Sequence, residues 1–329
     1  MSTEGGIGAG TAAGMAPGAF GLAISSDAGI PGLDTPGAVA GARRVDHQLV
    51  GTEPLGERLG NQALTQLLRE GDGSLRVELH QHPSGALLIR TASFGEHLIG
   101  DGGRTVLSAG TRTDPGLWQR YVLGQVLPLA ASVQGLEIFH ASAVAVAGGV
   151  VALAGPPGAG KSSIAASLIG AGAGTFFADD VLALDATAFE LTAYPGPTLI
   201  AIPHDRYPAL GERFFTGPPG LVVGGKTLAR VRGERQALAV RSFLRLNPDP
   251  GARGISFEAC LPDRLMGTTF DGVSRGQERL LRLLRIAAML AADGRARELR
   301  YPPGTDPRAL AEALLDRLAI TGAAGADAA

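Results

Sequence analysis

The sequence predicts an α/β protein in which a phosphate-loop domain follows a small, mainly β lobe. Residues 155–163 contain the pattern G-x-x-x-x-G-K-[ST], with an apolar run at 150–154 before it and a helical pattern at 162–168 after it. Short apolar runs separated by glycine-rich turns fill residues 43–110 and are typical of an antiparallel sheet. A strand, a glycine-rich loop and a helix in this order form a phosphate-binding arrangement.

Composition and charge exclude several classes of protein. The chain has 329 residues, of which 45% are hydrophobic and 18% charged, so it can bury a sizeable core. Its net charge of −2 gives no electrostatic reason to bind nucleic acid or an anionic membrane. The single cysteine, Cys260, excludes a disulfide framework. Without an apolar run of membrane-spanning length or a signal-peptide pattern, we expect a cytoplasmic protein with no nucleic-acid or membrane partner.

Four regions follow from the composition along the chain. Residues 1–42 are rich in Gly, Ala, Pro, Ser and Thr, which predicts a disordered tail, although a partner-binding segment near Phe20 is left open. Residues 43–134 are expected to form the β-rich lobe with a linking helix. Residues 135–322 form the phosphate-loop domain, and 323–329 are a second disordered tail.

The lobe is expected to contain strands at 75–79 and 86–91 and a short helix at 60–68. His80 and His82 alternate onto one face of a strand, where they could bind a metal. Since no third ligand stands nearby in the sequence, we favour an exposed strand face.

A longer helix is predicted at 115–133. Asp114 is the expected N-cap, and Pro115 occupies the first helical position, where its missing N–H costs nothing. Pro128 should kink or shorten the helix. Trp118, the only tryptophan, is expected to anchor packing.

The phosphate-loop domain begins with a hairpin of strands at 139–146 and 150–154. Glycines let backbone N–H groups approach phosphate oxygens, and the helix that follows adds its positive dipole end. Lys161 would reach the β- and γ-phosphates, and the Ser162 hydroxyl would bind Mg²⁺. The expected nucleotide-binding residues are Gly155, Pro156, Pro157, Gly158, Ala159, Gly160, Lys161, Ser162 and Ser163.

Two aspartates follow the next predicted strand, at 175–178. One helix separates this strand from the loop, so it can return beside the first strand with its end near the loop. Carboxylates at that edge stand where a metal ion and an attacking hydroxyl meet. We expect Asp179 to be the catalytic base and Asp180 to bind the metal, with the two roles exchangeable.

The rest of the chain gives weaker signals. Lys161 and Lys226 are the only lysines among 29 basic residues, so Lys226 is either functional or a chance surface residue. The arginines at 279, 282 and 285 are expected on a solvated helix face. Further strands are predicted at 198–202, 237–246, 255–260 and 297–301, and a hairpin of 221–223 with 227–231. Helices are predicted at 206–215, 277–292 and 307–320. The inner stripe of the helix at 277–292 is expected to consist of Leu280, Leu284, Ala287, Ala288 and Ala291.

The run from His140 through the loop to Asp179, Asp180 and Asp185 resembles the catalytic domain of the HPr kinase/phosphorylase family, and more closely the broader set of HPr-kinase-related serine kinases. The resemblance implies a phosphoenolpyruvate-carboxykinase-like fold with a mixed sheet around the phosphate loop. It also implies ATP and Mg²⁺ as cofactors. His140 matches the family's histidine upstream of the loop and Asp179 its catalytic base, so both, with Lys161, are expected to be catalytic.

The resemblance implies phosphoryl transfer from ATP to a serine of a peptide or small protein, and such kinases also modify precursor peptides in natural-product pathways. The chain lacks the segment that supplies a further glutamate and arginine in true HPr kinases. HPr itself as substrate and the reverse phosphorolysis reaction are therefore left open. The sequence also leaves open whether the chain forms a homo-oligomer. The alternatives are a small-molecule kinase of the shikimate or gluconate type and a non-catalytic nucleotide-binding regulatory module.

Overall fold

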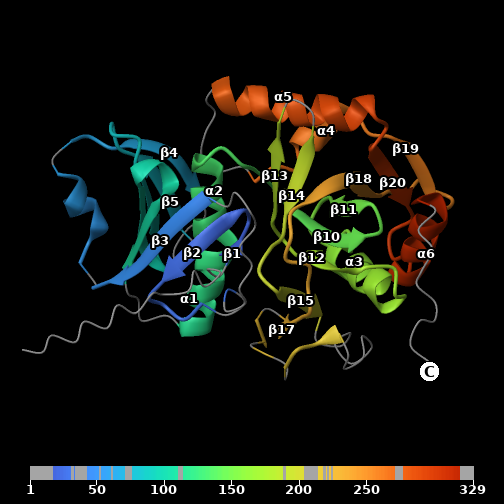
Figure 1. The fold of residues 1–329 in the computed structure, drawn as a ribbon, viewed down its shortest axis with the longest axis horizontal. Coiled ribbons are helices and arrows are strands. Elements are labelled where there is room, and N and C mark those ends of the chain that lie inside the picture. The colour runs from blue at the N-terminus through green and yellow to red at the C-terminus, as the bar shows by residue number, and fades with distance from the viewer. Residues whose placement is uncertain are drawn as a thin grey trace, which may run out of the picture.

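The computed structural model describes residues 18–30, 33, 43–51, 53–60, 62–70, 76–109, 114–187, 190–203, 214–217, 220, 222–223, 225–270 and 277–318. Within these ranges the chain forms two large mixed sheets, a small third sheet, and helices between and around them (Figure 1). The predicted α/β class and mixed sheet are confirmed at this level. No helix in these ranges is both long and apolar enough to cross a membrane.

The first sheet comes from the N-terminal third of the chain. β2 pairs parallel with β3, and β3 parallel with β8, while the remaining pairs are antiparallel. Two 3-10 turns, η1 (Leu55–Leu59) and η3 (Asp101–Gly103), flank it. The strands lie in the order β1 (Gly18–Ala19), β2 (Leu22–Ser26), β3 (Arg43–Val50), β8 (Thr105–Ala109), β7 (Gly95–Gly100), β6 (Leu87–Thr91), β5 (Val77–Gln81), β4 (Thr65–Glu70).

The helix predicted at 60–68 is wrong. η1 ends at Leu59, and β4 begins at Thr65 and pairs antiparallel with β5. Cross-strand pairing outweighs the weak local helical tendency of this stretch, because strand preference depends on the neighbours that a strand finds.

The predicted disordered tail is wrong over residues 18–30. β1 and β2 form a hairpin whose turn residues, Phe20 and Gly21, have φ of 57° and 72°, as the favoured two-residue turn requires. Leu22 and Ile24 are fully buried in the core. The low apolar content of the segment misled the prediction, because a few apolar side chains suffice when the core that they complete is built by the rest of the chain. Residues 1–17 and 323–329 lie outside the described residues.

The helix predicted at 115–133 is present in three parts: α1 (Pro115–Tyr121), a π-helical turn η4 (Val122–Val126) and α2 (Leu127–Val133). Asp114 Oδ1 accepts hydrogen bonds from the N–H groups of Gly116 and Leu117 at 2.9 and 3.1 Å, which confirms the N-cap. The π-turn widens the helix just before Pro128, where an ordinary turn would bring the ring against a carbonyl. Trp118 is buried, as expected of a packing anchor.

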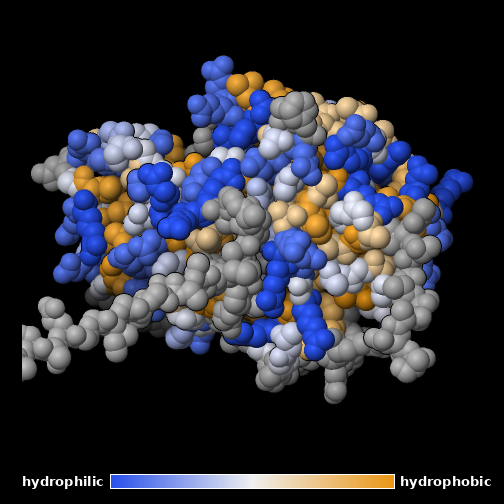
Figure 2. Space-filling view, viewed as in Figure 1, coloured by the Kyte–Doolittle hydropathy of each residue, from blue (hydrophilic) through white to orange (hydrophobic). Residues whose placement is uncertain are grey.

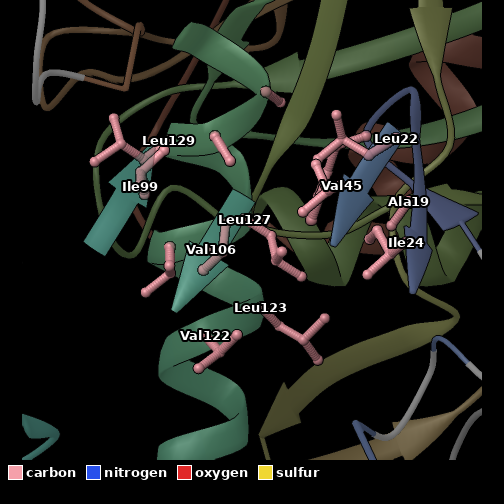
Figure 3. Packing of buried hydrophobic residues seen from close by; sticks show 14 of the residues in the cluster. Ala19, Leu22, Ile24, Val45, Ile99, Val106, Val122, Leu123, Leu127 and Leu129 are labelled. Atoms are coloured by element: carbon pink, nitrogen blue, oxygen red, sulfur yellow. The ribbon is translucent and has the colours of Figure 1, made fainter. Parts of the chain in front are cut away.

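This helix lies between the two large sheets and is covered on both sides (Figure 1). Figure 3 shows Val122, Leu123 and Leu127 of the helix among side chains of the first sheet. The same cluster continues into the second sheet through Leu136, Ile138, Val181 and Ala183. One hydrophobic core therefore connects the two sheets.

The second sheet is mixed, because β11 pairs parallel with β18 and β18 parallel with β20, whereas its other pairs are antiparallel. β20 pairs with residues 243–248 in the C-terminal half of β18, and β19 pairs with β20. The strands lie in the order β12 (Thr175–Ala178), β10 (Ala141–Val146), β11 (Gly149–Ala154), β18 (Leu238–Pro248), β14 (Leu191–Tyr194), β13 (Leu182–Ala186), β9 (Glu137–Phe139), with β20 (Ala296–Tyr301) and β19 (Ser256–Ala259) beside β18.

Helices cover both faces of this sheet. The alternation of β10 sends Val144 and Val146 toward α3 (Lys161–Gly170) and α6 (Pro307–Leu318), and Ala143 and Ala145 toward α5 (Gln277–Ala292). A short α4 (Pro262–Met266) lies beside α5. The predicted C-terminal strands and helices are confirmed within a few residues.

The predicted inner stripe of α5 is confirmed only at Ala287 and is wrong at its other residues. Its buried residues are Arg279, Leu283, Ile286, Ala287 and Leu290. Leu280 and Leu284, from the predicted stripe, are each 47% exposed, and hydrophobic atoms are visible along this edge of the molecule in Figure 2.

The buried face of α5 was mispredicted for two reasons, the apolar residues around the helix and the pairing of Arg279 with Glu137. Apolar residues surround most of α5, so the pattern did not fix the buried face. Arg279, which was expected in solvent, is buried against Glu137 of β9: its Nε and Nη2 donate to Glu137 Oε1 at 3.0 and 2.8 Å.

The third sheet packs below β12 and α3 (Figure 1). Its order is β15 (Leu199–Pro203), β17 (Lys226–Arg230), β16 (Val222–Val223), and both pairings are antiparallel. The strand predicted at 198–202 and the predicted hairpin are thereby confirmed. The helix predicted at 206–215 lies mostly outside the described residues.

Candidate functional site

The 155–161 loop connects β11 to α3. Gly155 has φ of +150°, and a Cβ there would lie 2.8 Å from the carbonyl oxygen of Leu246 on β18, so only glycine fits. Gly160, with φ of +90°, is the N-cap of α3. The expected nucleotide-binding residues 155–163 thus form one continuous turn into a helix N-terminus. Nucleotide binding by them stays a prediction.

Hydrogen bonds from Tyr301 of β20 and from Lys161 of the loop itself fix the loop conformation. The Tyr301 hydroxyl of β20 donates a 2.5 Å hydrogen bond to the Ala159 carbonyl, and burial raises the pKa of Tyr301 to about 12. Lys161 Nζ donates to the carbonyl oxygens of Gly155 and Pro156 at 2.8 and 3.2 Å. The loop is therefore preorganised, with its lysine folded over it.

The charge of this region suits an anion. The first N–H groups of α3 have no partner within the helix, and the helix dipole is positive there. Burial lowers the pKa of Lys161, while Asp180 and, to a smaller extent, Asp179 oppose that shift. The positive charge of Lys226 lowers the same pKa further. The charges of the two lysines therefore interact, and a functional role of Lys226 stays a prediction.

Asp179 follows β12 directly, at the edge of the sheet where the loop lies. β12 pairs with β10 rather than with β11, so the expected return beside the first strand is wrong by one position. Because β11 and β12 are both antiparallel to β10, their carboxyl ends still lie at the same edge. A register shift at Ala143 and Val144 also falls here, as bulges often do near functional sites.

Hydrogen bonds fix both oxygens of the Asp179 carboxylate. The Ser142 hydroxyl donates to Oδ1 at 2.7 Å, and the Ala201 N–H of β15 donates to Oδ2 at 2.9 Å. Ser162 also hydrogen-bonds to this carboxylate, and its hydroxyl oxygen lies 3.5 Å from that of Ser142. The structure thus brings together two residues predicted separately, Ser162 and Asp179.

Ser142 was missed by sequence reasoning. It lies on the face of β10 that carries Val144 and Val146, so its hydroxyl points toward α3. A buried polar residue within an otherwise apolar strand was the available signal.

The environment of Asp179 raises the pKa of its carboxyl group. Desolvation by the surrounding protein is the largest cause of the raised pKa, although the residue Asp179 is partly accessible to solvent. The hydrogen bonds from Ala201, Ser142 and Ser162 oppose the shift, and the charge of Asp180 adds to it. None of the salt bridges among the described residues involves Asp179. A carboxylate with a raised pKa is a stronger proton acceptor.

Asp180 is exposed and has φ of +68°, which is uncommon for a residue other than glycine. Such conformations concentrate at functional sites. The described residues contain no group of three His, Cys, Asp or Glu side chains that could hold a metal. Mg²⁺ bound with a nucleotide needs only one or two carboxylates, because phosphate oxygens and water complete its shell. Asp180 and the Ser162 hydroxyl fit that requirement.

Three histidines were singled out in the sequence, and the structure gives each side chain different neighbours. His140 joins β9 to β10, and its ring packs against Phe270 with centroids 5.1 Å apart. No hydrogen bond or ion pair in the described ranges connects its side chain to Lys161 or Asp179, so its catalytic role stays a prediction. His80 and His82 are each only 9% exposed, so the predicted exposed face is wrong. They contact Glu78 and Ser84 instead.

A cleft of about 620 Å³ opens beside the two aspartates, between the helix α1–η4 and the third sheet. Phe20 of the first hairpin also reaches it. Its lining residues are Phe20, Phe94, Gly116, Leu117, Gln119, Arg120, Tyr121, Leu123, Gly124, Gln125, Asp179, Asp180, Val181, Pro197, Leu199, Ala201, Gly217, Gly220, Leu228 and Arg230.

Comparison with known proteins gives little beyond this geometry. No family model and no curated protein sequence matches the chain. Among solved structures, the HPr(Ser) kinase/phosphatase from Coxiella burnetii aligns with a TM-score of 0.28 and 16% identity, over 55% of this chain and 88% of the other. The resemblance is distant and lies at the level of the fold, so function is inferred below from the site alone.

Proposed function

We propose that the protein is an ATP-dependent serine kinase, similar to HPr kinases, that transfers the γ-phosphate to a hydroxyl of a peptide or small protein. The observation that carries this proposal is the Asp179 carboxylate. It stands between the 155–161 loop and the cleft, has a raised pKa, and is held by neutral donors rather than by a cation. A residue so placed serves proton abstraction, for which mere nucleotide binding has no use.

The donor side consists of the loop and the start of α3. Backbone N–H groups of residues 155–163 and the Lys161 ammonium would bind the phosphates, which requires Lys161 to leave the carbonyl oxygens of Gly155 and Pro156. Ser162 and Asp180 would hold Mg²⁺, which supplies neutralisation of the negative charge on the phosphates.

The transfer step follows from the position of Asp179. Its carboxylate accepts the proton of the acceptor hydroxyl while the hydroxyl oxygen bonds to the γ-phosphorus. The bond from that phosphorus to the β,γ-bridging oxygen breaks, and ADP leaves with the bonding electrons. Ser142 and the Ala201 N–H keep the carboxylate oriented during this exchange. Lys161 and Lys226 offset the charge that develops on the transferred group.

The proposal is tested by incubating the protein with γ-³²P-labelled ATP, Mg²⁺ and serine-containing peptides, and then locating the label by mass spectrometry. Lys161→Ala should weaken ATP binding measured by calorimetry, because the lysine is the charged group nearest the phosphates. Lys226→Ala is the matched control and should bind ATP nearly as well as wild type. Absence of ATP binding by the wild-type protein would refute the proposed function.

A further inference from the structure

We propose that the cleft beside Asp179 is the acceptor site, and that it takes an extended peptide segment whose serine lies next to an apolar or aromatic residue and near an acidic one. This inference rests on the proposed kinase function and deepens it. It also gives the N-terminal lobe a role, because Phe20, Phe94 and the helix α1–η4 form one wall of the cleft.

The proposed nucleotide site and the proposed acceptor site meet at Asp179 and Asp180. Asp179 and Asp180 line the cleft, but no residue of the 155–163 loop does. A hydroxyl that enters through the cleft therefore approaches Asp179 from the side away from the loop. In-line transfer requires the attacking and leaving oxygens to lie on opposite sides of the γ-phosphorus, and entry through the cleft lets the acceptor approach that phosphorus from the side opposite the loop.

The apolar walls of the cleft favour an apolar side chain next to the acceptor serine. Phe94 and Tyr121 stack with centroids 4.6 Å apart, and Leu117, Leu199 and Leu228 extend the apolar surface. Burial raises the pKa of Tyr121 to about 12, so its hydroxyl stays neutral. A polyol would leave several hydroxyl groups against carbon, and each would lose hydrogen bonds to water. A serine beside an apolar side chain has no such penalty.

Charge selects the second feature. Arg120 of α1 and Arg230 of β17 both line the cleft, on its opposite walls. Arg120 forms no ion pair with another described residue. The negative charges in the cleft belong to Asp179 and Asp180, which are assigned to the base and the metal. An acidic side chain of the peptide would therefore find a complementary guanidinium away from the reacting atoms.

The wall also contains a π-helical turn with an open glycine. Gly124 lies in the π-turn η4, and such turns are frequent at functional sites. A Cβ added at Gly124 would meet no protein atom within 4 Å, so the glycine faces open space. Phe20, in the two-residue turn between β1 and β2, brings this hairpin to the cleft.

The first test fills the cleft. Gly124→Phe should fold, because phenylalanine is a better helix former than glycine and the position is open. With a degenerate library of peptides that each contain one serine, kcat/KM should fall on the order of 100-fold, since a displaced acceptor loses alignment. ATP affinity and the slow hydrolysis of ATP by water should stay unchanged. Gly170, in the last turn of α3 and outside the cleft, is equally open, so Gly170→Phe is the matched control and should behave as wild type. Full activity of Gly124→Phe toward the library would overturn the proposal.

The second test reverses a charge. The wild-type protein should select library peptides with an aromatic or aliphatic residue beside the serine and an acidic residue nearby. Arg120→Glu should lower kcat/KM for acidic peptides by about tenfold, as loss of a charge-assisted hydrogen bond predicts, and should shift the selection toward lysine. Unchanged selection in Arg120→Glu contradicts the assignment.

The outcomes separate this inference from the proposed function. If the wild-type protein fails to bind Mg²⁺–ATP, the kinase function itself is wrong. If it binds ATP but phosphorylates no peptide of the library, the peptide kinase function and the acceptor site are both overturned. If it phosphorylates library peptides but Gly124→Phe and Arg120→Glu do so with unchanged rates and selection, the kinase function stands and the acceptor site is overturned.

Discussion

Two carboxylates of the second sheet, Asp179 and Glu137, are removed from water in different ways. Glu137 is 1% exposed and accepts two hydrogen bonds from Arg279, which is itself buried. Asp179 is half-buried and accepts from two hydroxyl groups and one backbone N–H. Burial is the largest cause of a raised pKa for both carboxyl groups. Glu137 is hydrogen-bonded to a cation, whereas the hydrogen-bond donors of Asp179 are neutral, so the Asp179 carboxylate is the better placed of the two to accept a proton from a substrate.

The sign of the pH dependence is the same for both groups. A carboxyl group whose pKa is higher in the folded than in the unfolded protein favours folding most when it is protonated. Its contribution is lost as the pH rises through the folded-state pKa. Ionisation of Asp179 therefore costs stability, which is a common feature of catalytic groups. Arg279 offsets the corresponding cost for Glu137.

The largest expected effect is that of Asp179→Asn. Removal of a general base should lower kcat by about 10²- to 10⁴-fold. The variant should be at least as stable as wild type at pH 7, because the amide oxygen can accept from the Ala201 N–H and the amide nitrogen can donate to Ser142. Initial rates of peptide phosphorylation measure kcat, and chemical denaturation measures the free energy of unfolding.

Asp185→Asn is the matched control for that substitution. It breaks a partly exposed salt bridge to Arg43, of 2.9 Å, and should change stability by less than about 1 kcal/mol and leave kcat unaltered. Retention of kcat by Asp179→Asn would remove the base assignment. A large loss of stability in the same variant would show that Asp179 is structural, like Glu137.

The other carboxylate should give the reverse result. Arg279→Met leaves the buried Glu137 without its cation, and we expect a loss of about 3–5 kcal/mol in the free energy of unfolding at pH 7. The loss should shrink at lower pH, where Glu137 becomes protonated. The double variant Glu137→Gln with Arg279→Met should recover much of it. ATP affinity of the folded protein should not change, and a specific loss of ATP binding would contradict this division of roles.

The sequence allowed one of these two carboxylates to be interpreted and not the other. Asp179 stands a fixed distance after a recognisable loop and helix, so local pattern was enough. Glu137 and Arg279 are 142 positions apart, and their pairing depends on which face α5 turns to the sheet. The apolar residues that surround α5 left that face undetermined. Phe20, which joins the core and cleft from a glycine-rich segment, was misjudged for the same reason: its partners are distant in sequence.

A smaller effect is expected from Ser142→Ala. The substitution removes the hydroxyl that donates to Asp179 Oδ1, and this donor holds the pKa of Asp179 down against burial. The pKa should therefore rise further, and the pH at which kcat reaches its plateau should move upward. At pH 7 we expect a loss of about tenfold, which is typical of a lost hydrogen bond to a charged group.

Ser242→Ala is the matched control, because Ser242 is a buried strand serine that donates instead to the Arg295 carbonyl at 3.3 Å. It should leave the pH profile in place. An equal shift in both variants would mean that the profile reports general loosening of the sheet rather than the environment of Asp179.

The smallest effect is expected from Lys226→Ala. This substitution tests whether the Lys226 charge stabilises the transferred phosphoryl group near Asp179 and has no role in the free protein. The ammonium of Lys226 is exposed, and its charge lowers the pKa of Lys161 without forming a salt bridge to Asp179. Since solvent screens it in the free protein, Lys226→Ala should leave stability unchanged. In the transition state it would face the transferred phosphoryl group, so kcat should fall by about tenfold or less while the KM for ATP changes little.

Lys226→Arg keeps the positive charge and should retain most of the activity, which separates a role of charge from a role of shape. The loss in Lys226→Ala should also diminish at high salt, because screening weakens the same interaction in the wild-type protein. If kcat is identical in all three proteins at low salt, Lys226 is a surface residue whose proximity to Lys161 has no catalytic consequence. Neutralisation of the transferred group then falls to Lys161 and the bound metal alone.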